Sequence, residues 1–330
     1  MEHLQEKHLT TTRNLHYRYY TSPTPTTTTT TAPNQPALLL LHGWPDSALL
    51  WQPLLPHLLP LPHRLIIPDL LGYGGTSKPT SVPLYNYRLM LQDLLEILHA
   101  EGVTTILPIG HDFGCWLIFK LQNLHPSLCV AAVHIGIAYA PPLSQRLDPA
   151  TLIDTLNTLT THQVGYPRYS YFHLFTSPRA PSLFARNPRS VWHVLHGDAE
   201  DWTKHIFCTP DAMQNFLASS STDVPLKPYA QNAALYSEWH SNLQTPEDWE
   251  ASFCWYNAFA RESVQMEEDL RVGREKWVLE RPVLSVMCRG DGVNPPETLE
   301  EAKQAGWLPQ GREVVLECGH WCTYEAPEEV

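Results

Sequence analysis

The sequence predicts an α/β fold with a mostly parallel sheet, and two features of the chain predict it. Short, wholly apolar runs such as residues 37–41 are bounded by Pro, Gly or His. Such runs are typical of strands that are covered on both faces. They alternate with segments in which apolar residues recur at helical spacing, as in residues 87–100. Alternating strands and helices favour a parallel sheet with helices packed on it.

The individual elements can be placed in order. Residues 14–21 alternate polar and apolar side chains and predict a half-exposed strand, and residues 21–36 are almost all Thr and Pro and predict a surface loop. Pro108 lies inside a predicted central strand, where it cannot donate a ladder hydrogen bond, so we expect a bulge or local distortion there. Helices are predicted from Asn86 to about Ala100 and after Gly114. The remaining strands are predicted at residues 37–41, 64–69, 104–109, 130–137, 282–287 and 313–317.

The rhythm of strands and helices is interrupted in the middle of the chain. After residue 140 the sequence becomes rich in proline and tryptophan, and clear strand signals return only at residues 282–287. One α/β domain split by an insertion explains this pattern better than two independent domains. We therefore expect a first core part at 1–140, a helical cap at 141–270 and a second core part at 271–330.

Composition excludes several classes of function. The 330-residue chain has 22 Lys and Arg against 34 Asp and Glu, a net charge of −12, so attraction to nucleic acids or anionic membranes is not expected. No apolar run approaches the roughly 20 residues of a membrane span. The charged N-terminus is unlike a signal peptide, and the seven cysteines form no tight CxxC pair, which predicts free thiols and a cytoplasmic protein. The 17 histidines form no i, i+4 pair in a carboxylate-rich context, so no metal site is expected.

The segment from Gly110 to Gly114 carries the clearest chemical signal. Its pattern, Gly-His-Asp-Phe-Gly, places Asp112 between two glycines where a strand meets a helix. Such glycines permit a tight turn that holds the central side chain outward in a strained conformation, as a nucleophile requires. Taken alone, the pattern also fits a simple helix cap. We expect His111 to be a packed, hydrogen-bonded residue.

Three further motifs favour the interpretation of Asp112 as a nucleophile over that of a helix cap. His42-Gly43-Trp44-Pro45 follows the 37–41 run, and its backbone N–H groups can form an oxyanion hole together with the N–H of Phe113. Asp291 follows the strand predicted at 282–287, and His320 follows the strand predicted at 313–317. The order nucleophile, acid, histidine is that of α/β-hydrolases. The carboxyl ends of parallel strands meet at one edge, where we expect these side chains to gather.

These motifs, together with Gly-Asp-Gly-Val-Asn-Pro-Pro and Cys-Gly-His-Trp, resemble the epoxide hydrolase branch of the α/β-hydrolase fold, which is related to haloalkane and haloacetate dehalogenases. The elbow carries Asp112 rather than Ser, which disfavours a serine esterase. Phe113 stands where many relatives carry Trp. The family normally continues into one more helix after the histidine, so we expect this chain to lack that helix.

The resemblance implies a hydrolase acting on ether bonds. Asp112 would attack an epoxide carbon and form a covalent ester while two cap tyrosines donate hydrogen bonds to the oxygen. Tyr171 and Tyr256 are placed like those tyrosines, and Tyr166 and Tyr169 compete for the first role. His320, oriented by Asp291, would activate the water that releases a vicinal diol.

The resemblance also implies that no cofactor is needed and that the partners are a small apolar epoxide and water, with the chain a monomer or homodimer. The backbone N–H groups of Trp44 and Phe113 would form the oxyanion hole, and we expect substrate contacts from His42, Pro45 and Trp116. Three alternatives stay open: a dehalogenase of small halo-acids or halo-alkanes, a biosynthetic enzyme that opens or cyclises epoxides, and a ligand-binding member without turnover. A dehalogenase would need N–H donors for halide; Trp44 and Trp116 could supply them, but no asparagine follows Gly43.

Overall fold

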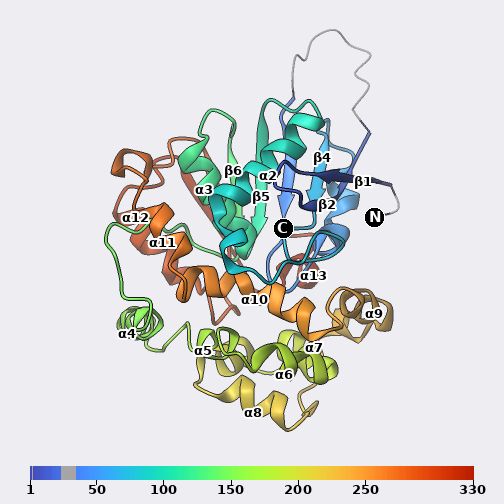
Figure 1. Ribbon diagram of the computed structural model, residues 1–330, viewed down its shortest axis with the longest axis vertical. Helices are drawn as coiled ribbons and strands as arrows, with labels where there is room; N and C mark the ends of the chain where they lie inside the picture. Colours follow the sequence, from blue (N-terminus) through green and yellow to red (C-terminus); the bar gives the residue numbers. More distant parts are fainter. Residues whose placement is uncertain (2, 24–34) are drawn as a thin grey trace.

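The computed structural model describes residues 1, 3–23 and 35–330, so residues 24–34 of the predicted Thr/Pro loop lie outside it (Figure 1). Its centre is an eight-stranded sheet with strand order β1-β2-β4-β3-β5-β6-β7-β8. Strands β1 and β2 are antiparallel to their neighbours, and all the other pairs are parallel. The predicted fold class is therefore confirmed. The strands are β1 (Gln5–Thr10), β2 (His16–Thr21), β3 (Ala37–Leu41), β4 (Leu65–Pro68), β5 (Ile106–His111), β6 (Ala132–Ile135), β7 (Val283–Cys288) and β8 (Gly311–Leu316).

Helices of the core follow the predicted pattern. Asn86 caps α2 through its side-chain oxygen, which accepts hydrogen bonds from the N–H groups of Arg88 and Leu89. The α3 helix packs against the central strands β3, β5 and β6. One turn of helix, α13, follows His320 and packs on η1. The core helices are η1 (Ala48–Leu54), α1 (Leu55–Leu58), η2 (Val82–Tyr85), α2 (Tyr87–Ala100), α3 (Phe113–Leu124), η5 (Arg274–Lys276), η6 (Pro296–Leu299), α12 (Glu300–Gln304) and α13 (Cys322–Glu325).

The helices between residues 141 and 270, which we call the cap, lie beyond the carboxyl ends of the parallel strands. In Figure 1, α4 to α9 lie together below the sheet, and α10 runs between them and the core. The limits 141–270 for this unit remain our proposal. Its elements are α4 (Leu152–Val164), α5 (Phe172–Phe175), α6 (Ala180–Arg186), α7 (Pro188–His196), η3 (Lys204–Cys208), α8 (Ala212–Ala218), η4 (Pro228–Gln231), α9 (Ala233–Ser241), α10 (Pro246–Ala260) and α11 (Val264–Asp269).

Pro108 is accommodated by an irregular stretch on one side of β5. Its pairing with β3 runs unbroken, with Leu39 opposite Pro108. On the other side of β5, the N–H of Ile106 donates to the carbonyl of Leu128, which leads into β6. Because alternate residues of a strand face the same neighbour, the nitrogen of Pro108 also faces β6. There Ile106 pairs with Cys129 and Ile109 with Val133, so the β6 side contains one residue more than β5. The predicted distortion is present beside the elbow.

The topology fixes where a site can form. From β3 the chain crosses to β4 on one side and then returns to β5 on the other side. At such a switch point the loops after the two adjacent strands diverge and leave a crevice at the carboxyl edge. The loop after β3 begins at His42, and Asp112 directly follows β5. The switch point therefore lies beneath the cap.

Candidate active site

Asp112 occupies the turn between β5 and α3 in a strained backbone conformation. Its φ of 53° lies in the left-handed region, which costs a residue other than glycine roughly 1–3 kcal/mol. The close approach of the neighbouring loop requires glycine at position 43, where a Cβ would lie 2.3 Å from the Cβ of Asp112. The side chain of Asp112 makes no capping hydrogen bond to α3, so the interpretation of Asp112 as a simple helix cap is wrong.

The carboxylate of Asp112 is held by backbone N–H groups instead. The Trp44 N–H donates to Asp112 Oδ1 at 2.9 Å. Burial raises the pKa of Asp112, while His320 and the backbone N–H groups of Trp44 and Phe113 oppose that rise. One carboxylate oxygen therefore already occupies the place expected for an oxyanion, and Oδ2 is left to face the cavity and His320.

Asp291 and His320 form a buried pair at the ends of β7 and β8. His320 Nδ1 lies 2.6 Å from Asp291 Oδ2, and the other oxygen of Asp291 accepts the N–H groups of Val293 and Asn294. His320 Nε2 lies 3.8 Å from Asp112 Oδ2, too far for a hydrogen bond. His111 is packed as expected and hydrogen-bonds to the carbonyl of His320 through Nε2.

Charge around this pair shifts both pKa values. Burial lowers the pKa of His320, but the carboxylates of Asp291, Asp112 and Asp46 outweigh it and raise the pKa to about 9. Burial alone would raise the pKa of Asp291. His320 and the N–H groups of Val293 and Asn294 outweigh it and hold the pKa of that carboxyl below its usual value. The pair is therefore an imidazolium and a carboxylate at neutral pH.

Two tyrosines from the cap complete the site. Tyr171 precedes α5 and Tyr256 lies in α10, with ring centroids 6.0 Å apart. Burial and then the nearby charge of Asp112 raise the pKa of Tyr171 well above its usual value, and Tyr256 shifts the same way through burial, Tyr171 and Asp112. Both hydroxyls therefore remain protonated donors. Tyr166 instead donates to the carbonyl of Gly292, and Tyr169 does not line the cavity, so Tyr171 fits the first role best.

These groups lie around a small cavity of about 20 Å³, room for roughly one water molecule. Five predicted site residues line it, and four further lining residues were missed. Val293 and Trp321 adjoin the Asp291 and His320 motifs, which could have indicated them. No sequence signal identified Thr203 or Phe207. The lining residues are Trp44, Asp112, Tyr171, Thr203, Phe207, Tyr256, Val293, His320 and Trp321.

The structure does not bring the three predicted substrate contacts His42, Pro45 and Trp116 into this cavity. His42 is fully buried, and both ring nitrogens have partners there: Nε2 accepts the N–H of Leu70 and Nδ1 bonds to the carbonyl of Gly43. Burial lowers the pKa of His42 to about 4, so the ring is neutral. Trp116 packs edge-on against Tyr87 and Phe113. None of the three lines this cavity, and contact of His42, Pro45 and Trp116 with substrate remains a proposal.

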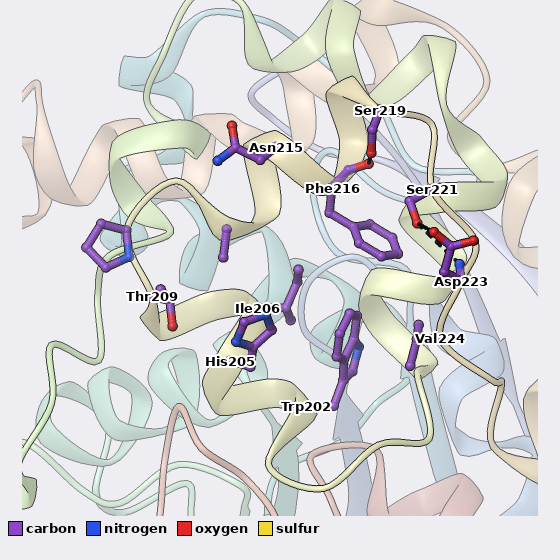
Figure 2. Close-up of a pocket in the computed structure, with 12 residues that line it drawn as sticks. Trp202, His205, Ile206, Thr209, Asn215, Phe216, Ser219, Ser221, Asp223 and Val224 are labelled. Carbon is purple, nitrogen blue, oxygen red and sulfur yellow. Dashed lines mark hydrogen bonds between the residues drawn. The ribbon is translucent and has the colours of Figure 1, made fainter.

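A larger hollow of about 700 Å³ lies on the cap, away from these side chains (Figure 2). Figure 2 shows Trp202 and His205 on one segment and Phe216 on another, with Ser219, Ser221 and Asp223 at the edge. None of the predicted catalytic side chains lines it. Among the residues that the structure describes, no three His, Cys, Asp or Glu side chains gather as metal ligands, and no helix is long and apolar enough to cross a membrane.

Comparison with known proteins gives consistent relatives. The profile of the alpha/beta hydrolase fold family matches residues 36–327. "Epoxide hydrolase srdG" of Neurospora crassa is 26% identical over 317 residues, which cover 89% of this chain and 83% of that protein. "Bifunctional epoxide hydrolase 2" of Rattus norvegicus is 24% identical over 89% of this chain but only 50% of its own length. The chain thus spans about half of that bifunctional relative.

Solved structures resemble the fold over nearly the whole chain. Epoxide hydrolase A from Mycobacterium thermoresistibile superposes with a TM-score of 0.77 at 21% identity, covering 99% of this chain and 95% of that one. Epoxide hydrolase VrEH1 from Vigna radiata gives a TM-score of 0.75 at 18% identity, covering 100% and 95%. At these identities the likeness concerns the fold.

Proposed function

Because the chain belongs to the α/β-hydrolase fold family, we propose that it is an epoxide hydrolase that converts a small apolar epoxide and water to a vicinal diol. The observation that carries this proposal is the set of side chains that meet at the small cavity under the cap. An aspartate on an elbow, two tyrosines and a histidine line it, and the histidine is hydrogen-bonded to Asp291. The names of the relatives support the same reaction.

In the first step, Asp112 Oδ2 attacks an epoxide carbon and the carbon–oxygen bond of the ring breaks. The leaving alkoxide is strongly basic, so it needs a proton donor at hand. The hydroxyls of Tyr171 and Tyr256 serve that need, because burial and the nearby charge of Asp112 keep them protonated. The alkyl–enzyme ester retains its carbonyl oxygen at the Trp44 N–H.

In the second step, His320 takes a proton from water, which attacks the ester carbonyl. In the free enzyme His320 is an imidazolium because Asp112 is one of the carboxylates that raise its pKa to about 9. Esterification removes the charge of Asp112, so the pKa of His320 falls; its proton passes to the tyrosine that protonated the alkoxide, which restores that hydroxyl and leaves the ring as a base. Asp291 holds Nδ1 and stabilises the imidazolium that forms again.

Two variants test the proposal. His320→Gln is expected to stop at the ester, visible in an intact-protein mass spectrum as an added substrate mass, while diol formation falls to background. Asp112→Ala removes the nucleophile and is expected to give neither adduct nor diol. Normal diol turnover by His320→Gln would show that the mechanism is wrong.

Measuring halide release beside diol formation distinguishes the proposed epoxide hydrolase from a dehalogenase, the main alternative. A dehalogenase would release halide from a small halo-acid or halo-alkane and produce no diol from an epoxide. The two hydroxyl donors favour an epoxide oxygen over a halide, for which N–H donors suit better. Incubating the wild type with both substrate classes and measuring halide beside diol decides between them.

Cellular setting and assembly follow as part of the proposal. All seven cysteines are free thiols, which suits a reducing compartment such as the cytoplasm. All five proposed catalytic side chains come from one chain, so a monomer or a homodimer can serve equally.

A further inference from the structure

The loops that carry Asp291 and His320 are both hydrogen-bonded by residues of the cap. These loops belong to the core, whereas Arg168, Tyr166 and Lys227 lie between β6 and β7. The contacts therefore cross from one part of the molecule to the other beside the acid–base pair.

Arg168 contacts the Asp291 loop directly. Its Nε donates to the carbonyl of Val293, and its Nη2 donates to Asn294 Oδ1 at 2.6 Å. Val293 and Asn294 are the two residues whose N–H groups bind Asp291 Oδ1. The guanidinium thus holds the far side of the turn that holds the carboxylate.

The burial of Arg168 makes this contact unusual. The residue is only 6% exposed, and no carboxylate among the described residues forms an ion pair with it. Burying a charge without a counter-ion costs free energy that a merely structural contact could avoid with an apolar side chain. The donors of Arg168 are instead directed to the Asp291 loop. Its backbone N–H donates to Thr160 of α4, which fixes its own position.

Neighbouring residues hold the same loop. Tyr166 donates its hydroxyl to the carbonyl of Gly292 at 2.8 Å. The η3 segment packs so closely on Gly292 that a Cβ there would lie 2.4 Å from the Cβ of Lys204. Two cap segments, the loop between α4 and α5 and the η3 segment, therefore fix the backbone directly after Asp291.

A second contact from the cap reaches the His320 loop. Lys227 pairs with Glu325 of α13, and Glu325 accepts the N–H of Gly319 at 2.8 Å. Gly319 directly precedes His320. The base is thus tied to the cap through one intervening carboxylate, much as the acid is tied through Arg168.

From these contacts we infer that the cap orients the acid–base pair and that Arg168 is the positioning residue for Asp291. This inference rests on the proposed function, because it assigns Arg168 to the step that needs the pair. Asp112 attack depends on the elbow and the tyrosines, whereas ester hydrolysis depends on the Asp291–His320 hydrogen bond. Loss of Arg168 should therefore slow hydrolysis selectively.

The test is single-turnover kinetics on Arg168→Met, which removes both donors and retains the length of the side chain. We expect the rate of ester hydrolysis to fall at least about tenfold, with the alkylation rate within about twofold of wild type, so that the ester accumulates. Arg168→Lys retains one donor and should recover part of the hydrolysis rate. Rapid quenching followed by mass spectrometry measures both steps.

Lys78→Met is the matched control. Lys78 also bridges core and cap, pairing with Asp248 at 2.9 Å, but touches neither loop. It should accumulate no ester. If Lys78→Met behaved like Arg168→Met, or if Arg168→Met slowed both steps equally, the inference would be overturned.

Two further outcomes keep the test decisive. Should Arg168→Met not fold, Tyr166→Phe removes only one hydroxyl from the same loop and should slow hydrolysis in the same selective way. No change in that variant would count against the inference. A wild type that forms no ester at all would instead overturn the proposed function, which is a separate result.

Discussion

At the scale of single residues, the site depends on one imidazole among three carboxylates. Asp291 hydrogen-bonds to His320 directly, and Asp112 and Asp46 act on it through their charge. Asp46 is buried and accepts the indole N–H of Trp321 at 3.0 Å. Burial raises the pKa of Asp46 to about 7, so its charge contributes mainly above that pH. The protonation of His320 is thus set by neighbours whose charges can change.

This arrangement predicts a pH dependence that differs between the two steps. In the free enzyme the pKa of His320 is about 9. In the ester the charge of Asp112 is gone, so hydrolysis should rise with pH through a midpoint below 9. An NMR titration of the free enzyme and the pH dependence of ester decay give the two values. A midpoint for ester decay at or above the free-enzyme value would contradict the argument.

Asp46→Asn supplies a control for that prediction. The amide oxygen can still accept the indole N–H of Trp321, so the packing is retained while one negative charge is lost. The pKa of His320 in the free enzyme should fall, with the largest effect above pH 7, where the carboxyl of Asp46 is ionised. An unchanged titration would mean that Asp46 has no electrostatic influence on the base.

Sequence patterns could predict some of these residues and not others, for a physical reason. Asp112, Asp291 and His320 each follow a strand of the parallel part of the sheet, so the geometry of that sheet gathers them. His42 follows a strand too, but its ring turns back to the backbone of Leu70, a choice that depends on packing. Arg168 lies in an irregular stretch of the cap, where no periodicity shows which loop a side chain will reach.

At the scale of elements, the elbow depends on how closely α3 approaches β3. A Cβ at Gly114 would lie 1.9 Å from the carbonyl oxygen of Leu41, and this backbone cannot retreat without disturbing the central strand. The contact is what lets the N-terminal end of α3 lie beside the loop that carries Trp44. A glycine is therefore required by space at this position.

Gly114→Ala should accordingly destabilise the fold by about 3 kcal/mol, through overpacking against backbone. Gly102→Ala is the matched control, because its Cβ would meet nothing within 4 Å and only its φ of +66° is unfavourable. That cost should be roughly 1–2 kcal/mol. Urea unfolding measures both. Equal losses would indicate that the helix can shift away from β3.

Sequence patterns predict a strand correctly where both of its faces are buried. The run at 37–41 is buried at every residue, and its predicted limits match β3. The strand β1 was not predicted, because it lies at the sheet edge with a charged sequence and mostly exposed or half-exposed residues. Its pairing with β2 provides hydrogen bonds that no hydrophobic pattern reveals.

At the scale of the whole molecule, a single buried ion pair joins the core to both ends of the cap. Lys120 of α3 lies 2.7 Å from Asp269 at the end of α11, with side chains 2% and 7% exposed. The second oxygen of Asp269 accepts the N–H of Leu143, where the chain enters the cap. The entry and exit of the inserted segment are therefore tied to one lysine of the helix that follows the nucleophile.

Removing only one member of this buried pair should lower the free energy of unfolding strongly, because the remaining charge is left buried and unpaired. Lys120→Met leaves Asp269 buried without its counter-ion and is expected to cost about 3–5 kcal/mol in the free energy of unfolding. Lys120→Met combined with Asp269→Asn removes both charges, retains an acceptor for Leu143, and should recover most of that loss. Arg146→Met breaks a pair with Glu267 at 2.6 Å whose side chains are 66% and 39% exposed, and it should cost less than about 1 kcal/mol. Denaturation curves for the three variants test this ranking. If the double variant were no more stable than Lys120→Met, the loss would have to come from packing of the lysine stem rather than from the unpaired charge.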